Sequence, residues 1–295
     1  MKKRLAVACI LFLSITVNAQ SLLWEISGNG LTNPSYIFGT HHFAPLSILD
    51  KIQGFKKAFD ATTQVVGELN TKDAQSPENI KKMQEKMFIT NDTTLQLLFN
   101  EKELEMIKAF FKANAGIDFT KAPKLKPALI SIMAIRILSD RTLPGFDPKK
   151  QLDSYFQVKG EENGKKIIAL ETIEFQRDLI YDSQSLKRQA RVLVCQLSDT
   201  TKVFNWLKEV NKAYLSFDLE KMAQLSEEKE GTSCDPLPGE RESMIDNRNK
   251  DWATKLPSIM KEAPSFVAVG AMHLPGKAGL IALLREQGFK VEPVK

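Results

Sequence analysis

Two Gly-x-x-His tetrapeptides hold the residues of this chain best suited to chemistry. They span Gly39–His42 and Gly270–His273, and together they contain every histidine of the protein, His41, His42 and His273. Each tetrapeptide directly follows a short apolar run typical of a buried strand. Because histidine is used so sparingly and stands at two matching strand ends, we expect the two segments to build one site.

Two further strand candidates end in a carboxylate. Residues 63–67 lead into Glu68, and residues 165–170 lead into Glu171. In open α/β sheets, ligands gather at the carboxyl ends of the strands, so we expect the histidines and the glutamates to converge. Two imidazoles and one carboxylate suit a catalytic divalent metal that keeps one position open for water.

Each of these residues also has an ordinary structural explanation. A strand-end histidine is often only hydrogen-bonded. Glu68 can face solvent, and Glu171 can favour the positive start of the following helix. The motif glycines, Gly39 and Gly270, can be turn residues and nothing more.

The two histidines of the first motif are not equivalent candidates. His41 alternates with His42 along the strand, so the two side chains are expected to point to opposite faces. His42 matches His273 in its position after the glycine and is therefore the predicted partner in the site.

The order of strand-like and helix-like segments around these residues predicts an α/β protein. Apolar runs predict strands, and amphipathic patterns between them predict helices and a large helical insertion at about 77–160 and 172–262. The two ends of the chain share a strand, a Gly-x-x-His motif, a proline and an amphipathic helix, so we expect two pseudo-symmetric halves. The predicted strands are 22–26, 35–39, 63–67, 165–170, 265–269 and 289–293, and the helices near the site are 48–59, 241–261 and 277–287.

Residues 1–19 predict a signal peptide, with three basic residues, an apolar stretch and small residues before Gln20. An uncleaved anchor is the alternative, although the apolar stretch is short for a membrane span. Cleavage would lower the formal net charge from +5 to about +2, which gives no argument for nucleic-acid binding. The mature chain, 20–295, would then carry no membrane span. It keeps Cys195 and Cys234, and an exported chain permits a disulfide between them.

At the level of motifs the chain resembles the TraB/PrgY/GumN family, which is related to the Tiki metalloproteases. The similar segments follow the family's order across the mature chain, and they imply an α/β fold with a divalent-metal peptidase site at the paired motifs. One departure is His41, where the family more often has an apolar residue. The segments are 35–42, 67–69, 169–176 and 269–276, with Gly145–Asp147, Leu152–Asp153, Arg248–Asn249 before Trp252, and 279–291.

The resemblance implies that His42 and His273 bind a divalent metal, Mn, Co or Zn, with Glu68 as the third ligand or the base. Glu171 is a second candidate base, and Arg248 is a candidate to stabilise an oxyanion. Asp153 would support the site, as would the motif glycines and His41.

The predicted function is an exported hydrolase, periplasmic or secreted, whose substrate is a peptide or protein. Two alternatives remain open. The first is a non-catalytic envelope protein that binds a metal, haem or a peptide. The second is a helical interaction module. The sequence does not select the metal, the substrate or the oligomeric state.

Overall fold

The computed structural model describes residues 20–143, 145–147 and 150–294 of the chain. The predicted signal peptide, residues 1–19, lies outside the described residues. Six strands of the described part form one sheet in the order β4-β3-β5-β2-β1-β6, and each predicted strand is confirmed to within two residues. The strands are β1 (Leu23–Gly28), β2 (Ser35–Thr40), β3 (Gln64–Gly67), β4 (Lys166–Ala169), β5 (Ser265–Gly270) and β6 (Phe289–Pro293).

The strands that lead into the predicted site are neighbours and run parallel, in the order β4, β3, β5 and β2. β1 pairs antiparallel with both β2 and β6. Parallel strands end at the same edge of a sheet, so Thr40, Gly67, Ala169 and Gly270 stand in a row along that edge. β2 and β3 are buried along their whole length and β5 up to Val269, as expected when helices cover both faces of a sheet.

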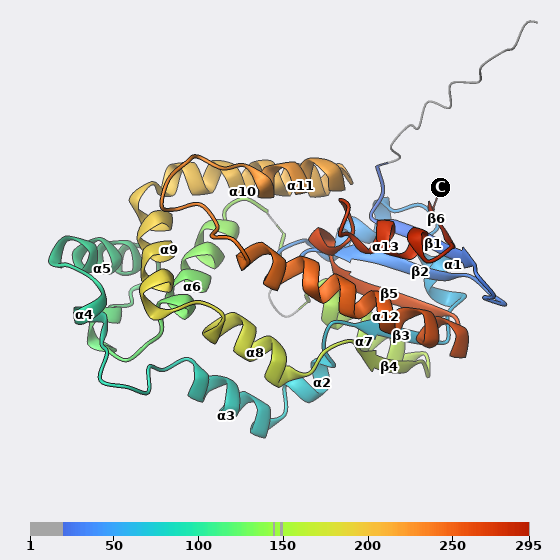
Figure 1. Cartoon of the computed structure of the whole chain (residues 1–295), viewed down its shortest axis with the longest axis horizontal. Coiled ribbons are helices and arrows are strands. Elements are labelled where there is room, and N and C mark those ends of the chain that lie inside the picture. The colour runs from blue at the N-terminus through green and yellow to red at the C-terminus, as the bar shows by residue number, and fades with distance from the viewer. Residues whose placement is uncertain (1–19, 144, 148–149, 295) are drawn as a thin grey trace, which may run out of the picture.

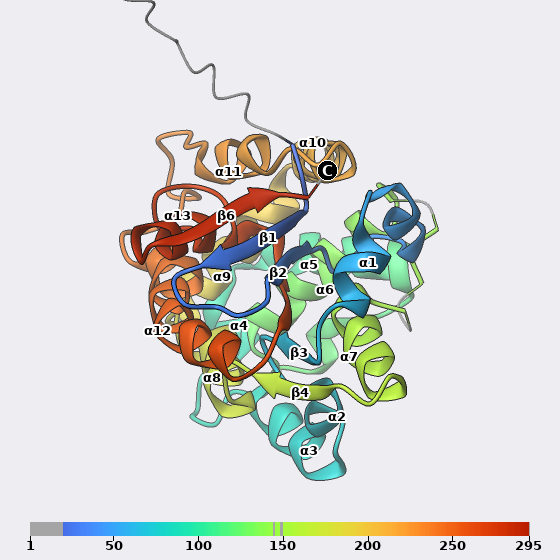
Figure 2. The ribbon, with the colours of Figure 1, turned by 90° about the vertical axis from the view of Figure 1, so that its right-hand side faces the viewer.

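Helices lie on both faces of the sheet. Helices α1 (Phe55–Asp60) and α7 (Leu152–Glu162) lie on one face, and α12 (Asn247–Glu262) and α13 (Leu280–Glu286) lie on the other (Figure 2). The first face is held by a phenylalanine cluster whose contacting ring centroids are 5.0 to 6.4 Å apart. Its members are Phe38, Phe55, Phe59, Phe156 and Phe266. The α/β class is therefore confirmed.

A second hydrophobic core lies away from the sheet, on the left in Figure 1. It is built by α4 (Leu95–Leu98), α5 (Glu101–Ala115), α6 (Pro127–Ser139) and α9 (Leu186–Ser198). The remaining helices are α2 (Thr71–Ala74), α3 (Pro77–Lys86), α8 (Ile173–Asp182), α10 (Thr200–Leu215) and α11 (Leu219–Glu227). Because α7, α10, α11 and α12 contribute to the core of the sheet, the predicted helical section is only in part a separate lobe.

Glycines explain where the helices differ from the prediction. The expected helix 48–59 is a 3-10 turn, Leu46–Lys51, followed by α1, because Gly54 adopts a left-handed conformation with φ 73° between them. A left-handed residue interrupts a right-handed helix, and glycine adopts it without steric cost. The expected helix 277–287 begins only at Leu280, because the preceding Gly279 is its N-cap and has an extended backbone with ψ 152°.

A disulfide joins Cys195 on α9 to Cys234 in the loop that precedes α12, across 39 residues of sequence. In the same loop, Glu240 accepts two hydrogen bonds from Arg188 of α9, at 2.8 and 2.9 Å. The loop that leads into α12 is therefore fastened to the second core by a covalent bond and by an ion pair.

Candidate functional site

The structure brings together side chains from three of the four predicted strand ends around a single arginine. β3 leads into Glu68 and β4 into Glu171, while β5 leads through a 3-10 turn, Ala271–His273, into His273. Arg248 of α12 contacts all three of these side chains. These residues are far apart in sequence and meet only because their strands end at one edge.

The guanidinium of Arg248 is 6% exposed and is fully engaged. Its Nε and Nη2 donate to the carboxylate of Glu171 at 2.7 and 2.9 Å, and Nη2 also donates to Glu68 at 2.6 Å. Burial opposes the charge, but the two carboxylates outweigh it and raise the pKa of Arg248. Arg248 thus provides the counter-charge for two buried carboxylates that would otherwise repel each other.

The two carboxylates differ in what surrounds them. Glu171 is 3% exposed, and its Oε1 also accepts the indole N–H of Trp252 at 3.0 Å. Glu68 is 17% exposed and accepts from Gln176 at 3.0 Å and from the backbone N–H of Gly270 at 2.8 Å. Glu171 is therefore an enclosed counterion, whereas Glu68 is the carboxylate open to a ligand.

The glycines of both motifs are required by close packing. A Cβ on Gly39 would lie 3.0 Å from the Cα of Ala271, inside the second motif. A Cβ on Gly270 would lie 3.3 Å from Oε1 of Glu68 and 3.5 Å from Cδ2 of His273. The first glycine lets the two motifs approach, and the second makes room for the glutamate.

The hydrogen bonds of His273 define its tautomer. The Nδ2 group of Asn249 donates to the carbonyls of His273 and Ala278, at 3.2 and 2.8 Å, so its Oδ1 must be the atom 2.7 Å from Nδ1 of His273. Nδ1 therefore carries the proton, and Nε2 accepts from Nη1 of Arg248 at 3.1 Å. Burial lowers the pKa of His273 to about 4, which keeps the ring neutral.

His42 has a different environment. Its side chain is 68% exposed, and its Nδ1 lies 3.2 Å from Oδ2 of Asp153. Asp153 is held in place by Thr40, whose hydroxyl donates to Oδ1 at 2.6 Å. The hydrogen bond and charge of Asp153 raise the pKa of His42 to about 9, and the charges of Glu68 and Arg248 act on it as well.

The two motifs are neighbours but not equivalent. Thr40 of β2 pairs with Gly270 of β5, so the motif glycines are offset by one residue across the sheet. His41 follows the end of β2, its ring centroid lies 4.9 Å from that of Tyr214, and burial lowers its pKa to about 4. Met272 packs against the hydrophobic core of the sheet.

Three residues at this site were part of the family resemblance, but the sequence assigned them no role. Gln176 bridges both carboxylates, Asn249 orients His273, and Trp252 donates to Glu171. Amides and an indole are common surface and core residues, so only their position after motif residues could have drawn attention to them.

Among the described residues, no three His, Cys, Asp or Glu side chains form a ready-made metal site. Nε2 of His273 and Oε1 of Glu68 are 3.9 Å apart, whereas two ligands on one tetrahedral zinc ion are about 3.4 Å apart. The Arg248 guanidinium contacts both of these side chains and occupies the position that a metal cation would take.

The donor chemistry nevertheless fits a divalent metal. Metal-binding histidines almost always direct their other ring nitrogen at an oxygen acceptor. His42 faces Asp153 in this way, and His273 faces Asn249.

The sequence model of the TraB/PrgY/gumN family matches residues 22–293, which is almost the whole described chain. The chain belongs to the TraB/PrgY/gumN family. Both Gly-x-x-His motifs, Glu68, Glu171 and Arg248 lie inside the matched region of this family member.

Two relatives of this TraB/PrgY/gumN protein are named as metalloproteases. Metalloprotease TIKI2 of Danio rerio is 22% identical over 322 aligned positions, which cover 92% of this chain and 60% of the relative. The Metalloprotease TIKI homolog of Nematostella vectensis is 23% identical over 330 positions, which cover 94% of this chain and 68% of the relative. The chain thus spans between three fifths and about two thirds of these relatives. No solved structure matches it.

No helix within the described residues has both the length and the apolar character needed to cross a bilayer.

Proposed function

We propose that this protein is an exported, divalent-metal-dependent peptidase, with His42, His273 and Glu68 as the metal ligands. One observation carries the proposal: Nδ1 of each motif histidine faces an oxygen acceptor, so Nε2 is the nitrogen of each ring that could bind a metal. The names of the TIKI relatives support metalloprotease chemistry and a peptide or protein substrate.

A divalent metal, when bound, polarises a carbonyl and makes water nucleophilic near neutral pH. Proton transfer and positioning are assigned to two glutamates of the chain. Glu68 is the partly exposed carboxylate and can accept a proton from an attacking water and pass it to a leaving amine. Glu171 is enclosed by Arg248 and Trp252 and therefore acts as a positioning residue.

Binding of a metal would change the hydrogen bonds of Arg248. It bonds to Glu68 and faces His273 in the structure, so these two side chains must exchange the guanidinium for the metal. The bonds of Arg248 to Glu171 can persist during that exchange, since they use Nε and the opposite side of Nη2. A guanidinium so held next to a substrate carbonyl suits the stabilisation of negative charge.

The test compares the parent protein with His42→Ala, His273→Ala and the matched control His41→Ala. Each protein is purified without chelator, its metal content is measured, and proteolysis is screened with Mn²⁺, Co²⁺ and Zn²⁺. Metal and cleavage should be lost in the first two variants and kept in His41→Ala. Equal metal content and equal cleavage in all four proteins would overturn the proposal, and metal without cleavage would indicate the non-catalytic binding alternative.

A further inference from the structure

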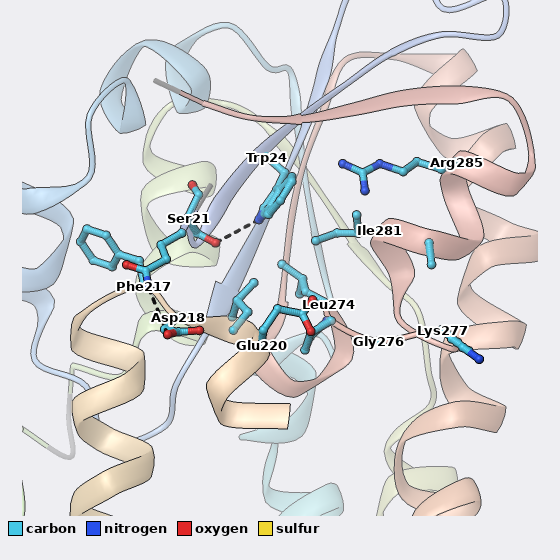
Figure 3. Close-up of a pocket in the computed structure, with 14 residues that line it drawn as sticks. Ser21, Trp24, Phe217, Asp218, Glu220, Leu274, Gly276, Lys277, Ile281 and Arg285 are labelled. Carbon is cyan, nitrogen blue, oxygen red and sulfur yellow. Dashed lines mark hydrogen bonds between the residues drawn. The ribbon is translucent and has the colours of Figure 1, made fainter. Parts of the chain in front are cut away.

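A cavity of about 530 Å³ lies beside the site described above and plays no part in it. It is enclosed by the start of β1, by the turn between α10 and α11, and by the segment from Leu274 to Arg285 (Figure 3). Small-molecule pockets in proteins commonly have volumes of about 300 to 1,000 Å³. The cavity is therefore large enough for a ligand of a few residues.

The middle of the cavity is apolar. Trp24, Leu274 and Ile281 lie between its two ends (Figure 3). The indole N–H of Trp24 donates to the carbonyl of Ser21 at 3.0 Å, so the ring offers the cavity only its apolar surface. An aliphatic or aromatic group is the natural occupant of this part.

The two sides of the cavity carry opposite charges. Asp218 and Glu220 lie on the side of α11, and the guanidinium of Arg285 lies across from them on the side of α13 (Figure 3). Nε and Nη2 of Arg285 donate to the carbonyl of Val291 at 3.1 and 2.6 Å, and its Cζ lies 5.6 Å from the centre of the Trp24 ring. Among the described residues, Nη1 is the part of this guanidinium left for a ligand. Asp218 is partly engaged, because it accepts from Gln20 at 3.0 Å and from the N–H of Lys221 at 2.9 Å. Within the described residues, Glu220 has no ion-pair partner. A lone anion or a lone cation would suit only one side, whereas a zwitterion suits both.

The backbone at the aromatic wall is strained. Phe217 lines the cavity with φ 64°, a left-handed conformation that bulky residues rarely adopt. It is held there by hydrogen bonds from its own N–H to Tyr214 and from the N–H of Asp218 to Ala213, both 2.9 Å long. These two bonds form a Schellman motif, which ends α10 with a left-handed residue and fixes the position of Phe217 at the cavity.

The cavity shares a wall with the candidate metal site. Leu274 directly follows His273, and its side chain lies 3.5 Å from the position of a Cβ on Gly39. Asn249 holds the same segment from its other side through the carbonyls of His273 and Ala278. An occupant of the cavity would thus press on the segment that carries His273.

We propose that this cavity binds a short peptide with free termini and an apolar side chain. The amino group faces Glu220 and Asp218, the carboxylate faces Arg285, and the side chain packs on Trp24 and Ile281. The proposal does not depend on the proposed peptidase activity, because none of the residues that bind this ligand belongs to the candidate metal site.

The experiment is a calorimetric titration of the purified protein with the dipeptide Leu-Phe and with its N-acetylated, C-amidated form. The variants are Glu220→Gln, Ala282→Trp, which fills the cavity without changing charge, and Glu228→Gln as an exposed control just beyond α11. Circular dichroism verifies that each variant is folded. His273→Ala separates this ligand from the metal site.

The free dipeptide should bind with one saturable site, and loss of one ion pair in Glu220→Gln should weaken binding roughly five- to tenfold. The capped peptide lacks both terminal charges and should bind more weakly still. Ala282→Trp should abolish binding, and Glu228→Gln and His273→Ala should bind like the parent. The proposal is overturned by no saturable binding to the parent, by equal binding of the capped peptide, or by unchanged affinity in Glu220→Gln and Ala282→Trp. Binding lost in His273→Ala would place the ligand at the metal site and would also overturn it.

Discussion

Nη1 of Arg248 lies 3.1 Å from Nε2 of His273, so the guanidinium engages the lone pair that a metal would use. The same arginine is the shared counter-charge of Glu68 and Glu171. One cation against two carboxylates leaves this cluster with an excess of negative charge, and a metal that binds there has to compete with an internal cation. This relationship makes Arg248 the residue whose replacement is most informative.

Replacing Arg248 with Gln should destabilise the metal-free protein by about 3–5 kcal/mol, because it leaves two buried carboxylates without a counter-charge. Added Zn²⁺ or Mn²⁺ should raise the free energy of unfolding of this variant more than that of the parent, since ligand binding to the folded state stabilises it. Denaturant unfolding with and without metal measures both effects. Lys250→Gln, which removes an exposed charge from the same helix, should behave like the parent. Parent-like stability in Arg248→Gln would contradict the role of Arg248 as the shared counter-charge of the two glutamates.

Replacing Asn249 with Ala removes the oxygen that accepts from Nδ1 of His273 and two bonds to neighbouring carbonyls. The affinity for Zn²⁺ should fall about 10- to 100-fold, as is usual for the loss of such an orienting partner. A fluorescence competition titration measures the affinity. The exposed neighbour variant Asn247→Ala should keep the affinity of the parent, and an equal affinity in Asn249→Ala would show that His273 needs no orientation.

The motif glycines should respond differently to alanine. Gly39→Ala forces a methyl group against backbone atoms of Ala271 and should cost about 1–3 kcal/mol of stability. Gly270→Ala meets the tip of the Glu68 carboxylate instead, so its main effect should be weaker metal binding with a smaller loss of stability. Thermal unfolding and metal titration of both variants test this contrast, which a reversed order of the two effects would refute.

Glu240 should make stability depend on pH in the acid range. Burial acts to raise the pKa of this carboxyl, but the bonds from Arg188 and from the N–H of Leu237 outweigh burial and hold it below its usual 4.5. Its contribution is therefore complete above pH 4.5 and is lost as the pH falls through the lowered value. Glu240→Gln should lose about 1–3 kcal/mol at pH 7, and the difference from the parent should shrink below pH 4.5. Unfolding free energies measured stepwise from pH 7 downward test this, and a difference that stays constant would count against it.

The disulfide between Cys195 and Cys234 closes a loop with a sequence separation of 39. A loop of this length should lose about 4 kcal/mol of stability when the bond is removed, by the entropy of the unfolded chain. The double variant with serine at both positions should therefore unfold at a lower denaturant concentration, and a reducing agent should lower the midpoint of the parent alone. An unchanged midpoint in the double variant would mean that the loop is held by Arg188 and Glu240 without the covalent bond.

Local sequence patterns were sufficient to predict the strands, the residues at the strand ends and the family. Apolar runs before Glu68, Glu171 and the two Gly-x-x-His motifs are local features, so their periodicity is visible without a fold. The rule that parallel strands present their carboxyl ends at one edge then predicted that distant residues meet. The helix break at Gly54 could not be predicted in this way, because a glycine within an amphipathic pattern is compatible with a continuous helix until its backbone conformation is known.

The charge distribution of the site and the burial of one histidine follow from the packing of the folded chain. Arg248 lies 77 residues beyond Glu171 in the sequence, and its bonds to Glu171, Glu68 and His273 depend on how α12 packs on the sheet. The one-residue offset between β2 and β5 likewise comes from strand register, and no local pattern contains it. Burial and hydrogen bonding set the protonation of a side chain, and both are properties of the folded chain. His273 is therefore neutral and enclosed, while the similar motif places His42 in the open beside Asp153.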